Sequence, residues 1–153
     1  MNEDFLDILR ALCATGARFL VVGAHALAGH GVPRATGALD LWVETSPDNI
    51  PRIWQALAEF GAPVEALGIE PQDFAAPGAV VQIGLPPRRI DLMTSITGVD
   101  FGDAWTSRVE INGAGIVVPV LGRECLIANK RALVRPQDLA DVYALSRADG
   151  RAP

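Results

Sequence analysis

The sequence predicts a single α/β domain in which helices flank a mixed β-sheet. The chain has 153 residues, half of them hydrophobic and 20% charged, which suits one domain with a sizeable core. Short apolar or alternating runs, typical of strands, occur between segments with helical periodicity. Two pairs of such runs are joined by short turns, and hairpins of this kind make part of a sheet antiparallel.

The chain begins with a predicted helix, strand and short helix. Asn2 is a good N-cap for a segment in which apolar residues recur at helical spacing, and Gly16 ends that segment. Residues 18–23 are apolar and rich in β-branched side chains, as in a buried strand. Residues 24–31 then have the composition of a short helix that ends at a glycine.

A strand and a longer helix are expected next. In residues 38–44, leucine and valine alternate with other residues in the period of a strand. The run Ser46-Pro47-Asp48 predicts a helix start, with proline at the first helical position and an acid in the first turn. Gly61 stops this helix, and the proline-rich residues 62–78 are expected to be loop with at most one helical turn.

The second half of the chain supplies two hairpins and the C-terminal helices. The predicted elements are a hairpin of strands 79–84 and 88–94, a short helix over 100–105, a second hairpin of strands 108–112 and 115–120 turned at Asn112-Gly113, and a helical part over about 122–148 with a break near Arg135-Pro136. The sequence contains neither an internal repeat nor a linker, so residues 1–153 are expected to form one domain.

Composition restricts the class of protein and its compartment. The formal net charge is −5, which argues against non-specific coating of nucleic acid but leaves room for a local basic pocket. Cys13 and Cys125 lie far apart, as expected of free thiols in a reducing compartment. The N-terminus resembles no signal peptide, and the apolar runs are too short to span a membrane. We therefore expect a cytoplasmic protein with no membrane partner.

Several common sites are absent from the sequence. The position two residues after Gly23 is His25, so the glycine pattern of a dinucleotide site is broken. His25 and His30 are five residues apart, which does not match the spacing of a zinc-binding helix. Gly23 opens a helix after a strand, and this glycine either contributes backbone N–H groups to a phosphate site or only permits close packing of helix and sheet.

Asp40 and Asp91 are the most informative pair of residues. Each interrupts a predicted strand between apolar neighbours, where an ionised carboxylate is costly unless a cation compensates for it. Two neighbouring strands that each present an aspartate could hold Mg²⁺ and, through it, phosphate oxygens. Alternatively, each aspartate simply points to solvent from the face of an edge strand.

The stretch FLVVGAHALAGHGVPRATGALDLWV resembles the nucleotidyltransferases of the polymerase β-like superfamily, in their small bacterial toxin-like and abortive-infection-like branch. Those proteins combine a hydrophobic strand, Gly and a small residue, a spacer of about a dozen residues, Asp-hydrophobic-Asp, and a third Asp on a later strand. Gly23-Ala24 matches the first element, Asp40 the second carboxylate and Asp91 the third. The tail LIANKRALVRPQDLADVYAL resembles the C-terminal helices of the family, so the likeness covers most of the chain.

Ala38 departs from this pattern, because the family has the first aspartate of its Asp-x-Asp pair at that position. The resemblance implies that the three aspartates bind Mg²⁺ or Mn²⁺, which bridges a nucleoside triphosphate (NTP). Loss of one carboxylate should weaken metal binding and reduce the rate. Ala38 is then either a natural lapse or a deliberate inactivation.

The resemblance also implies the reaction and its participants. A nucleoside monophosphate (NMP) would pass from NTP to a hydroxyl of RNA such as tRNA, of a protein or of a small molecule, with Asp91 activating the hydroxyl and Asp40 sharing the metal. A toxin role in toxin–antitoxin or phage defence, with a cognate antitoxin as partner, would follow. The expected nucleotide-binding residues are Gly23, Ala24, His25, Arg34, Thr36 and Lys130, the chain's one lysine. The alternatives are a lapsed module that binds a nucleotide or a partner, and a plain structural subunit.

Overall fold

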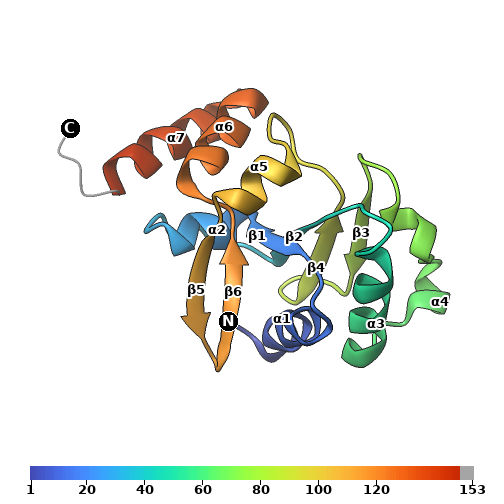
Figure 1. Cartoon of the computed structure of the whole chain (residues 1–153). Helices are drawn as coiled ribbons and strands as arrows, with labels where there is room; N and C mark the ends of the chain where they lie inside the picture. The colour runs from blue at the N-terminus through green and yellow to red at the C-terminus, as the bar shows by residue number, and fades with distance from the viewer. Residues whose placement is uncertain (149–153) are drawn as a thin grey trace.

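Six strands form one mixed sheet in the order β3-β4-β2-β1-β6-β5 (Figure 1). The computed structural model of this chain describes residues 1–148. The strands are β1 (Phe19–Val22), β2 (Ala38–Val43), β3 (Val80–Ile83), β4 (Arg89–Met93), β5 (Val109–Gly113) and β6 (Ile116–Val120). The helices are α1 (Glu3–Thr15), α2 (Gly23–Gly29), α3 (Ile50–Phe60), α4 (Val64–Leu67), the 3₁₀ helix η1 (Pro71–Phe74), α5 (Phe101–Thr106), α6 (Arg123–Leu133) and α7 (Pro136–Ala148).

The predicted mixed sheet is confirmed by the strand pairing. At the centre, β2 runs antiparallel to β1 and parallel to β4, while β1 is parallel to β6. The two outer pairs, β3 with β4 and β5 with β6, are the antiparallel hairpins expected from the sequence. Strand β2 therefore lies between β1, which precedes it in the chain, and β4, which follows it only after α3, α4, η1 and β3.

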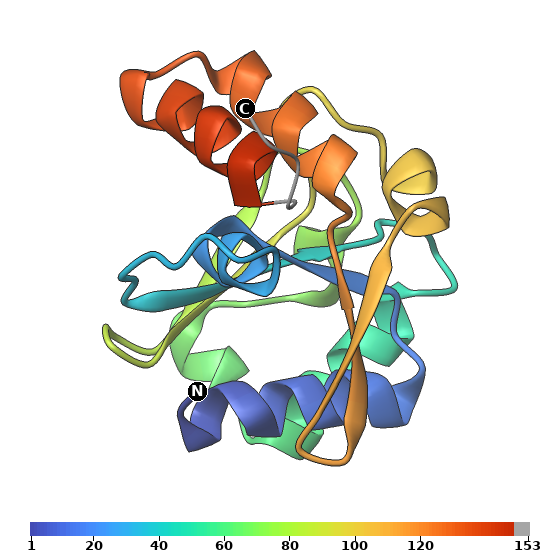
Figure 2. The same ribbon diagram turned by 90° about the vertical axis from the view of Figure 1, so that its left-hand side faces the viewer.

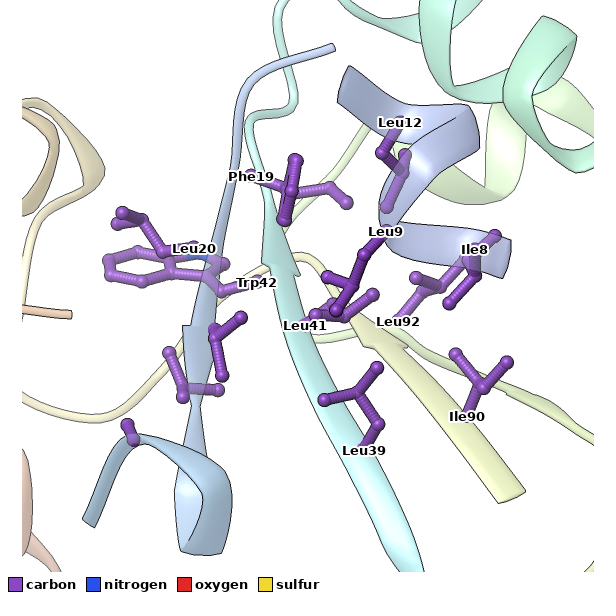
Figure 3. Packing of buried hydrophobic residues seen from close by; sticks show 14 of the residues in the cluster. Ile8, Leu9, Leu12, Phe19, Leu20, Leu39, Leu41, Trp42, Ile90 and Leu92 are labelled. Atoms are coloured by element: carbon purple, nitrogen blue, oxygen red, sulfur yellow. The ribbon is translucent and has the colours of Figure 1, made fainter. Parts of the chain in front are cut away.

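The alternation of residues along β2 separates two layers of helices. Leu39 and Leu41 are fully buried and point to the same side as Leu9 of α1, as Figure 3 shows. Helices α1 and α3 cover this face, and α6 and α7 lie on the other side of the sheet (Figures 1 and 2). Trp42 points to that second face, where its ring meets Phe101 of α5 edge-on with centroids 5.0 Å apart. Residues 38 and 40 share this face with Trp42 because side chains alternate along a strand.

The start of α3 corrects one prediction. Pro47 and Asp48 do not open a helix but belong to a turn, and α3 begins at Ile50. Asn49 fixes this turn from inside the protein: its Oδ1 accepts a hydrogen bond from the Arg18 N–H at 2.7 Å, and its Nδ2 donates to the Glu44 carbonyl at 2.9 Å. With 1% of its surface exposed, Asn49 satisfies buried backbone groups that local helix signals do not reveal.

The turn of the second hairpin also differs from the prediction. The strands continue through Asn112 and Gly113, and the chain reverses at Ala114 and Gly115 instead. Both turn residues have positive φ, 50° and 79°, which matches the twist of a two-residue hairpin. The turn therefore lies two residues after the Asn112-Gly113 pair at which the sequence predicted it. Residues 62–78 are also more regular than expected, since they contain both α4 and η1.

Within residues 1–148, the structure contains no helix that is both long enough and apolar enough to cross a membrane.

Candidate active site around Asp40 and Asp91

Two aspartates from different parts of the chain meet on the second face of the sheet. Asp40 of β2 and Asp91 of β4 are direct partners in the parallel register, so their side chains project from adjacent strands on the same side. They are close enough for one carboxyl group to hydrogen bond to the other. The same register pairs Ala38 with Arg89, two residues earlier on each strand and therefore on the same face. Folding therefore brings together the two carboxylates that the sequence singled out, with Ala38 beside them.

Arg89 neutralises much of the charge on Asp91. Its Nε donates to Oδ1 of Asp91 at 3.0 Å, and its Nη2 donates to Oδ2 at 3.2 Å. Only 6% of Asp91 is exposed, so this two-pronged contact is the kind of compensation that a buried carboxylate requires. Alignment of the guanidinium with both carboxylate oxygens leaves Asp91 well satisfied in this conformation.

Within residues 1–148 no arginine or lysine forms such a direct ion pair with Asp40, and its pKa changes accordingly. Burial raises the pKa of Asp40 from 3.8 to about 6, helped by the charge of Asp91 and the hydrogen bond with it. Arg89 and Lys130 act in the opposite direction but do not outweigh these effects. Asp40 therefore holds a proton more readily than an ordinary aspartate, as expected of a carboxylate forced close to another one.

The backbone at the start of α2 packs directly against Asp40. Gly23 has a φ of 66°, and a Cβ at this position would overlap with Oδ2 of Asp40. Both the backbone conformation and the close approach require glycine here. Gly23, for which the sequence suggested either close packing or phosphate binding, thus packs closely against a carboxylate of the site.

A cleft of about 310 Å³ opens next to Asp40. It lies between the sheet, the loop after β4 and helix α6, and two cations are among its lining residues. The polar and charged residues that line it are Asp40, Ser95, Thr97, Asn129, Lys130 and Arg135. Within this lining, Asn129 ties the loop to α6 by donating a hydrogen bond to the Thr97 carbonyl at 2.9 Å. The cleft offers space for a ligand next to the carboxylates.

Lys130, which lines the cleft, is held in place by two buried acids of α7. Its Nζ lies 3.5 Å from Oδ1 of Asp138 and 3.4 Å from Oδ2 of Asp141. Arg34 pairs with Asp141, and Arg135 donates from Nε to Asp138 at 2.6 Å. The hydrogen bond from Arg135 lowers the pKa of Asp138, which is fully buried. Three cations thus surround two carboxylates, leaving one net positive charge beside the cleft.

From the sequence alone, Asp138 and Asp141 near the start of α7 are expected to serve only helix-start electrostatics and local pairing. Asp138 does play that local part, since it accepts a hydrogen bond from the Arg135 N–H at 3.3 Å. Its burial and its contact with Lys130 depend on the packing of α6 against α7, which spacing along one helix does not reveal. The available signal was the i, i+3 spacing of the two acids, which places them on one face of a helix.

The remaining predicted nucleotide-binding residues lie at different distances from Asp40. Ala24 and Arg34 border a second cavity of about 300 Å³, which shares Lys130 with the cleft. Thr36 is occupied locally, since its hydroxyl donates to the Ala38 carbonyl at 2.9 Å and accepts from the Ala38 N–H. His25 points elsewhere: it meets the Phe5 ring edge-on and lines an apolar cavity toward α1. The structure thus gathers Gly23 and Lys130 around Asp40, but not His25.

The donor set determines what metal could bind. Within residues 1–148 no group of three or more histidine, cysteine, aspartate or glutamate side chains could hold a metal ion. Mg²⁺ bound together with a phosphate ligand commonly takes only one or two carboxylates from the protein. The two carboxylates of Asp40 and Asp91 match the number that one such ion takes from a protein.

Comparisons with known proteins add information at the level of the fold. No family model matches the chain, and no curated protein matches it. The structure is similar to that of a protein from Thermotoga maritima described as a "putative nucleotidyltransferase", with a TM-score of 0.56 and 15% sequence identity. That match covers 96% of this chain and 93% of the other. The chain thus has a nucleotidyltransferase-like α/β fold, and at this identity the likeness concerns the fold alone.

Proposed function

We propose that this protein is a nucleotidyltransferase in a catalytically impaired form. The observation that carries the proposal is the register of β2 and β4, which places Asp40 directly beside Asp91 at the edge of a cleft that also contains Lys130. Asp40 and Lys130 line the same cleft. A carboxylate pair with a lysine nearby suits a metal-bound polyphosphate, because the carboxylates hold the cation and the lysine contacts phosphate oxygens. The nucleotidyltransferase-like fold is consistent with this chemistry.

Asp40 and Asp91 would hold Mg²⁺, or Mn²⁺, together with the NTP. The ion would neutralise phosphate charge and polarise the reacting phosphoryl group. Lys130 and Arg135 line the cleft, and Arg34 lies in the cavity that adjoins it. These three cations would bind and orient the triphosphate. The backbone at Gly23 lies close enough to Asp40 to leave no room for a side chain between the metal ligand and the start of α2.

The reaction would transfer an NMP to a hydroxyl group. The hydroxyl oxygen attacks the α-phosphorus, the bond to the bridging oxygen breaks, and pyrophosphate leaves. Asp91 would accept the hydroxyl proton, for which Arg89 must first release at least one of the carboxylate oxygens that it now holds. RNA such as tRNA, a protein side chain or a small molecule is the proposed acceptor. A toxin role in the cytoplasm, restrained by an antitoxin, would fit such a reaction.

Ala38 accounts for the impairment. It lies on the same face as Asp40 and opposite Arg89, and it supplies a methyl group where the resemblance expects a carboxylate. An aspartate at this position would compete with Asp91 for Arg89. In this chain, Arg89 has no carboxylate opposite it in the register and turns to Asp91 instead. The substitution therefore removes one metal ligand and leaves the proposed base engaged.

The same contact favours the alternative function, a module that binds a nucleotide or a partner without transferring anything. With Asp91 paired to Arg89 and Asp40 prone to protonation, the site retains its cationic residues but holds a metal weakly. Calorimetry with each NTP, with and without Mg²⁺, measures this directly. A complete lack of binding at millimolar nucleotide would exclude both the transferase and a nucleotide-binding module, and would leave a partner-binding module or a structural role.

The Ala38→Asp variant distinguishes an impaired enzyme from a binding module. We expect this variant to transfer label from [α-³²P]NTP to a component of cell extract at least about a hundredfold faster than the Ala38 chain, since each ~1.4 kcal/mol of transition-state stabilisation is worth tenfold. Ala38→Asn is the matched control, because it has nearly the same shape but cannot ionise. Adding Asp91→Ala to the Ala38→Asp chain should abolish transfer again.

Failure of this experiment has a clear meaning. If the Ala38→Asp chain labels no RNA, protein or small-molecule fraction with any of the four NTPs, the impaired-enzyme proposal is refuted and the binding module replaces it. Expression of the same variant also tests the toxin role, because an active toxin slows growth whereas the Ala38→Asn control does not.

A further inference from the structure

The sheet has two edge strands, which differ in what lies beside them. Strand β3 is flanked by α4 and η1, because residues of both segments border one pocket together with residues 79–82. Strand β5 forms the opposite edge, and within residues 1–148 no strand pairs with its outer side. All of β5 is exposed, including Val109 at 39% and Ile111 at 36%. Figure 2 shows the β5–β6 hairpin extending from the sheet toward α1. Strand β5 is therefore the open edge of the sheet.

The backbone groups that β5 presents outward follow from its pairing with β6. Gly113 and Ile116 close a two-residue turn, and the pair that closes such a turn is hydrogen bonded. Along an antiparallel ladder, hydrogen-bonded pairs alternate with pairs that lack these bonds. Glu110 and its partner Pro119 belong to the second kind, which suits a proline because it has no N–H to donate. The N–H and C=O groups of Glu110, and those of Asn112, therefore point away from β6.

We propose that β5 pairs in antiparallel orientation with β5 of a second copy of this chain, with the two-fold axis at Ile111. In this register the N–H and C=O of Glu110 bond to the C=O and N–H of the partner's Asn112, and Asn112 bonds to the partner's Glu110 in the same way. Every outward backbone group of these two residues is then satisfied. The carboxylate of Glu110 also accepts a hydrogen bond from the side-chain amide of the partner's Asn112, and the two Ile111 side chains meet across the axis.

The charges of β5 favour this register over its neighbours. An axis at Glu110 would place two carboxylates opposite each other, which destabilises a strand pair. An axis at Val109 would need the N–H of Arg108, which already donates to the Trp105 carbonyl at 3.4 Å. An axis at Asn112 would bring Glu110 opposite the turn of the partner's hairpin, outside its strand. Strand β5 is thus complementary to itself in one register, which favours a second copy over an unrelated strand as its partner.

The composition of β5 also suits pairing. Proteins commonly protect an open edge with proline, lysine or a bulge. Strand β5 has neither proline nor lysine, and it pairs with β6 residue for residue, without a bulge. The contact is small, because one strand pair buries less than the roughly 1,200 Å² of a stable interface. We therefore expect a weak, reversible dimer with a Kd between about 10 µM and 1 mM. This dimer is independent of the proposed transfer reaction, since it involves neither Asp40 nor Asp91.

Sedimentation equilibrium of the unmodified chain between about 10 µM and 1 mM should show a monomer–dimer equilibrium. Two substitutions of one exposed residue test its register. Asn112→Lys places an ammonium group opposite the partner's Glu110 and should tighten the dimer about three- to tenfold, whereas Asn112→Glu places a second carboxylate there and should weaken it by a similar factor. Gln55→Lys and Gln55→Glu are the matched controls. They change the net charge equally at an exposed position of α3, where salt screens the added charge, and should alter the Kd by less than about twofold.

A disulfide across the axis tests the register directly. Ile111 lies opposite itself in the proposed dimer, and the Cα atoms of such a pair are about 4.5 Å apart, within reach of a disulfide. Oxidised Ile111→Cys should therefore form a linked dimer. Val109→Cys is the matched control, because Val109 lies on the same face of β5 but opposite the partner's Gly113. Both variants keep Cys13 and Cys125, so the unmodified chain gives the background of linkage through these residues.

Melting curves show whether each variant folds, and if Ile111→Cys does not fold, the comparison of Asn112→Lys with Asn112→Glu still decides. Three results would overturn the inference. A chain that stays monomeric to about 1 mM excludes the second copy and leaves this edge to a strand of another protein. A dimer with the same Kd in both Asn112 variants pairs through another surface, and one that Val109→Cys links as well as Ile111→Cys has another register. Activity of the carboxylate site plays no part in the readout, so failure here leaves the proposed function untouched.

Discussion

Replacement of Asp40 by asparagine should change how the stability of the protein depends on pH. Burial first, and then the neighbouring charge of Asp91, raises the pKa of Asp40 to about 6. Asparagine has nearly the same shape as aspartate, can still hydrogen bond to Asp91 and cannot ionise. Asp40→Asn therefore removes the charge while it preserves the packing of the residue against Gly23.

The sign and size of the effect follow from the shift. The pKa of Asp40 is higher in the folded protein, about 6, than the ordinary value of 3.8. The stabilisation from its protonation is therefore fully present below pH 3.8 and is lost as the pH rises through about 6. A shift of roughly two units corresponds to at most ~3 kcal/mol. Asp40 is partly exposed, so solvent screening reduces this to about 1–2 kcal/mol.

Urea denaturation of both chains between about pH 4 and pH 8 measures this quantity. The free energy of unfolding of Asp40→Asn should exceed that of the unmodified chain by about 1–2 kcal/mol at the upper end, and the difference should shrink toward the lower end. Asp103→Asn is the control, because Asp103 is exposed and should alter the two ends equally. A constant difference across the pH range for Asp40→Asn would refute the argument that burial and Asp91 raise this pKa.

Three further substitutions test other parts of the structure by urea denaturation. Gly23→Ala should destabilise the protein by about 1–3 kcal/mol more than Gly16→Ala, because both glycines have positive φ but only Gly23 abuts Asp40; equal losses would contradict this close approach. Lys130→Met should cost about 1–3 kcal/mol, against less than about 0.5 for the exposed neighbour Arg131→Met, since it leaves Asp138 and Asp141 with one cation fewer. Val134→Gly should stabilise by about 1 kcal/mol, because Val134 is 67% exposed and ends α6 with a φ of 53°, and a loss of stability would contradict that backbone conformation.

Local patterns predicted the elements of this fold more successfully than their connections. The alternation in residues 38–43 correctly separated Leu39 and Leu41 from Asp40, because successive side chains of a strand point to opposite faces of the sheet. Each hairpin was predicted from two neighbouring runs. The parallel pairing of β2 with β4 is different, since it joins segments about 50 residues apart. No local rule sets that register, so the proximity of Asp40 and Asp91 rested on resemblance to a family.

Some features of the site arise only from tertiary packing. Lys130 was predicted as a binding residue because it is the one lysine in the chain. Its buried partners Asp138 and Asp141 could not be predicted, since they meet Lys130 only through the packing of α6 against α7. For His25, the position in the sequence did not predict the direction of the side chain. Its place just after Gly23 suggested a phosphate ligand, yet successive residues of a helix point in different directions, and the second residue after Gly23 turns toward α1.

Under the proposed function, the residues around Ala38 would link the stability of the site to its impairment. An aspartate at position 38 would be a third carboxylate among buried side chains, next to Asp40, whose pKa is already raised by burial and by the charge of Asp91. Without a bound cation, such a cluster destabilises the fold, because each added negative charge disfavours ionisation of the others. Alanine relieves this repulsion and frees Arg89 to neutralise Asp91. Under the proposed function, the alanine that would cost a metal ligand would therefore also leave Asp91 neutralised by Arg89 when no metal is bound.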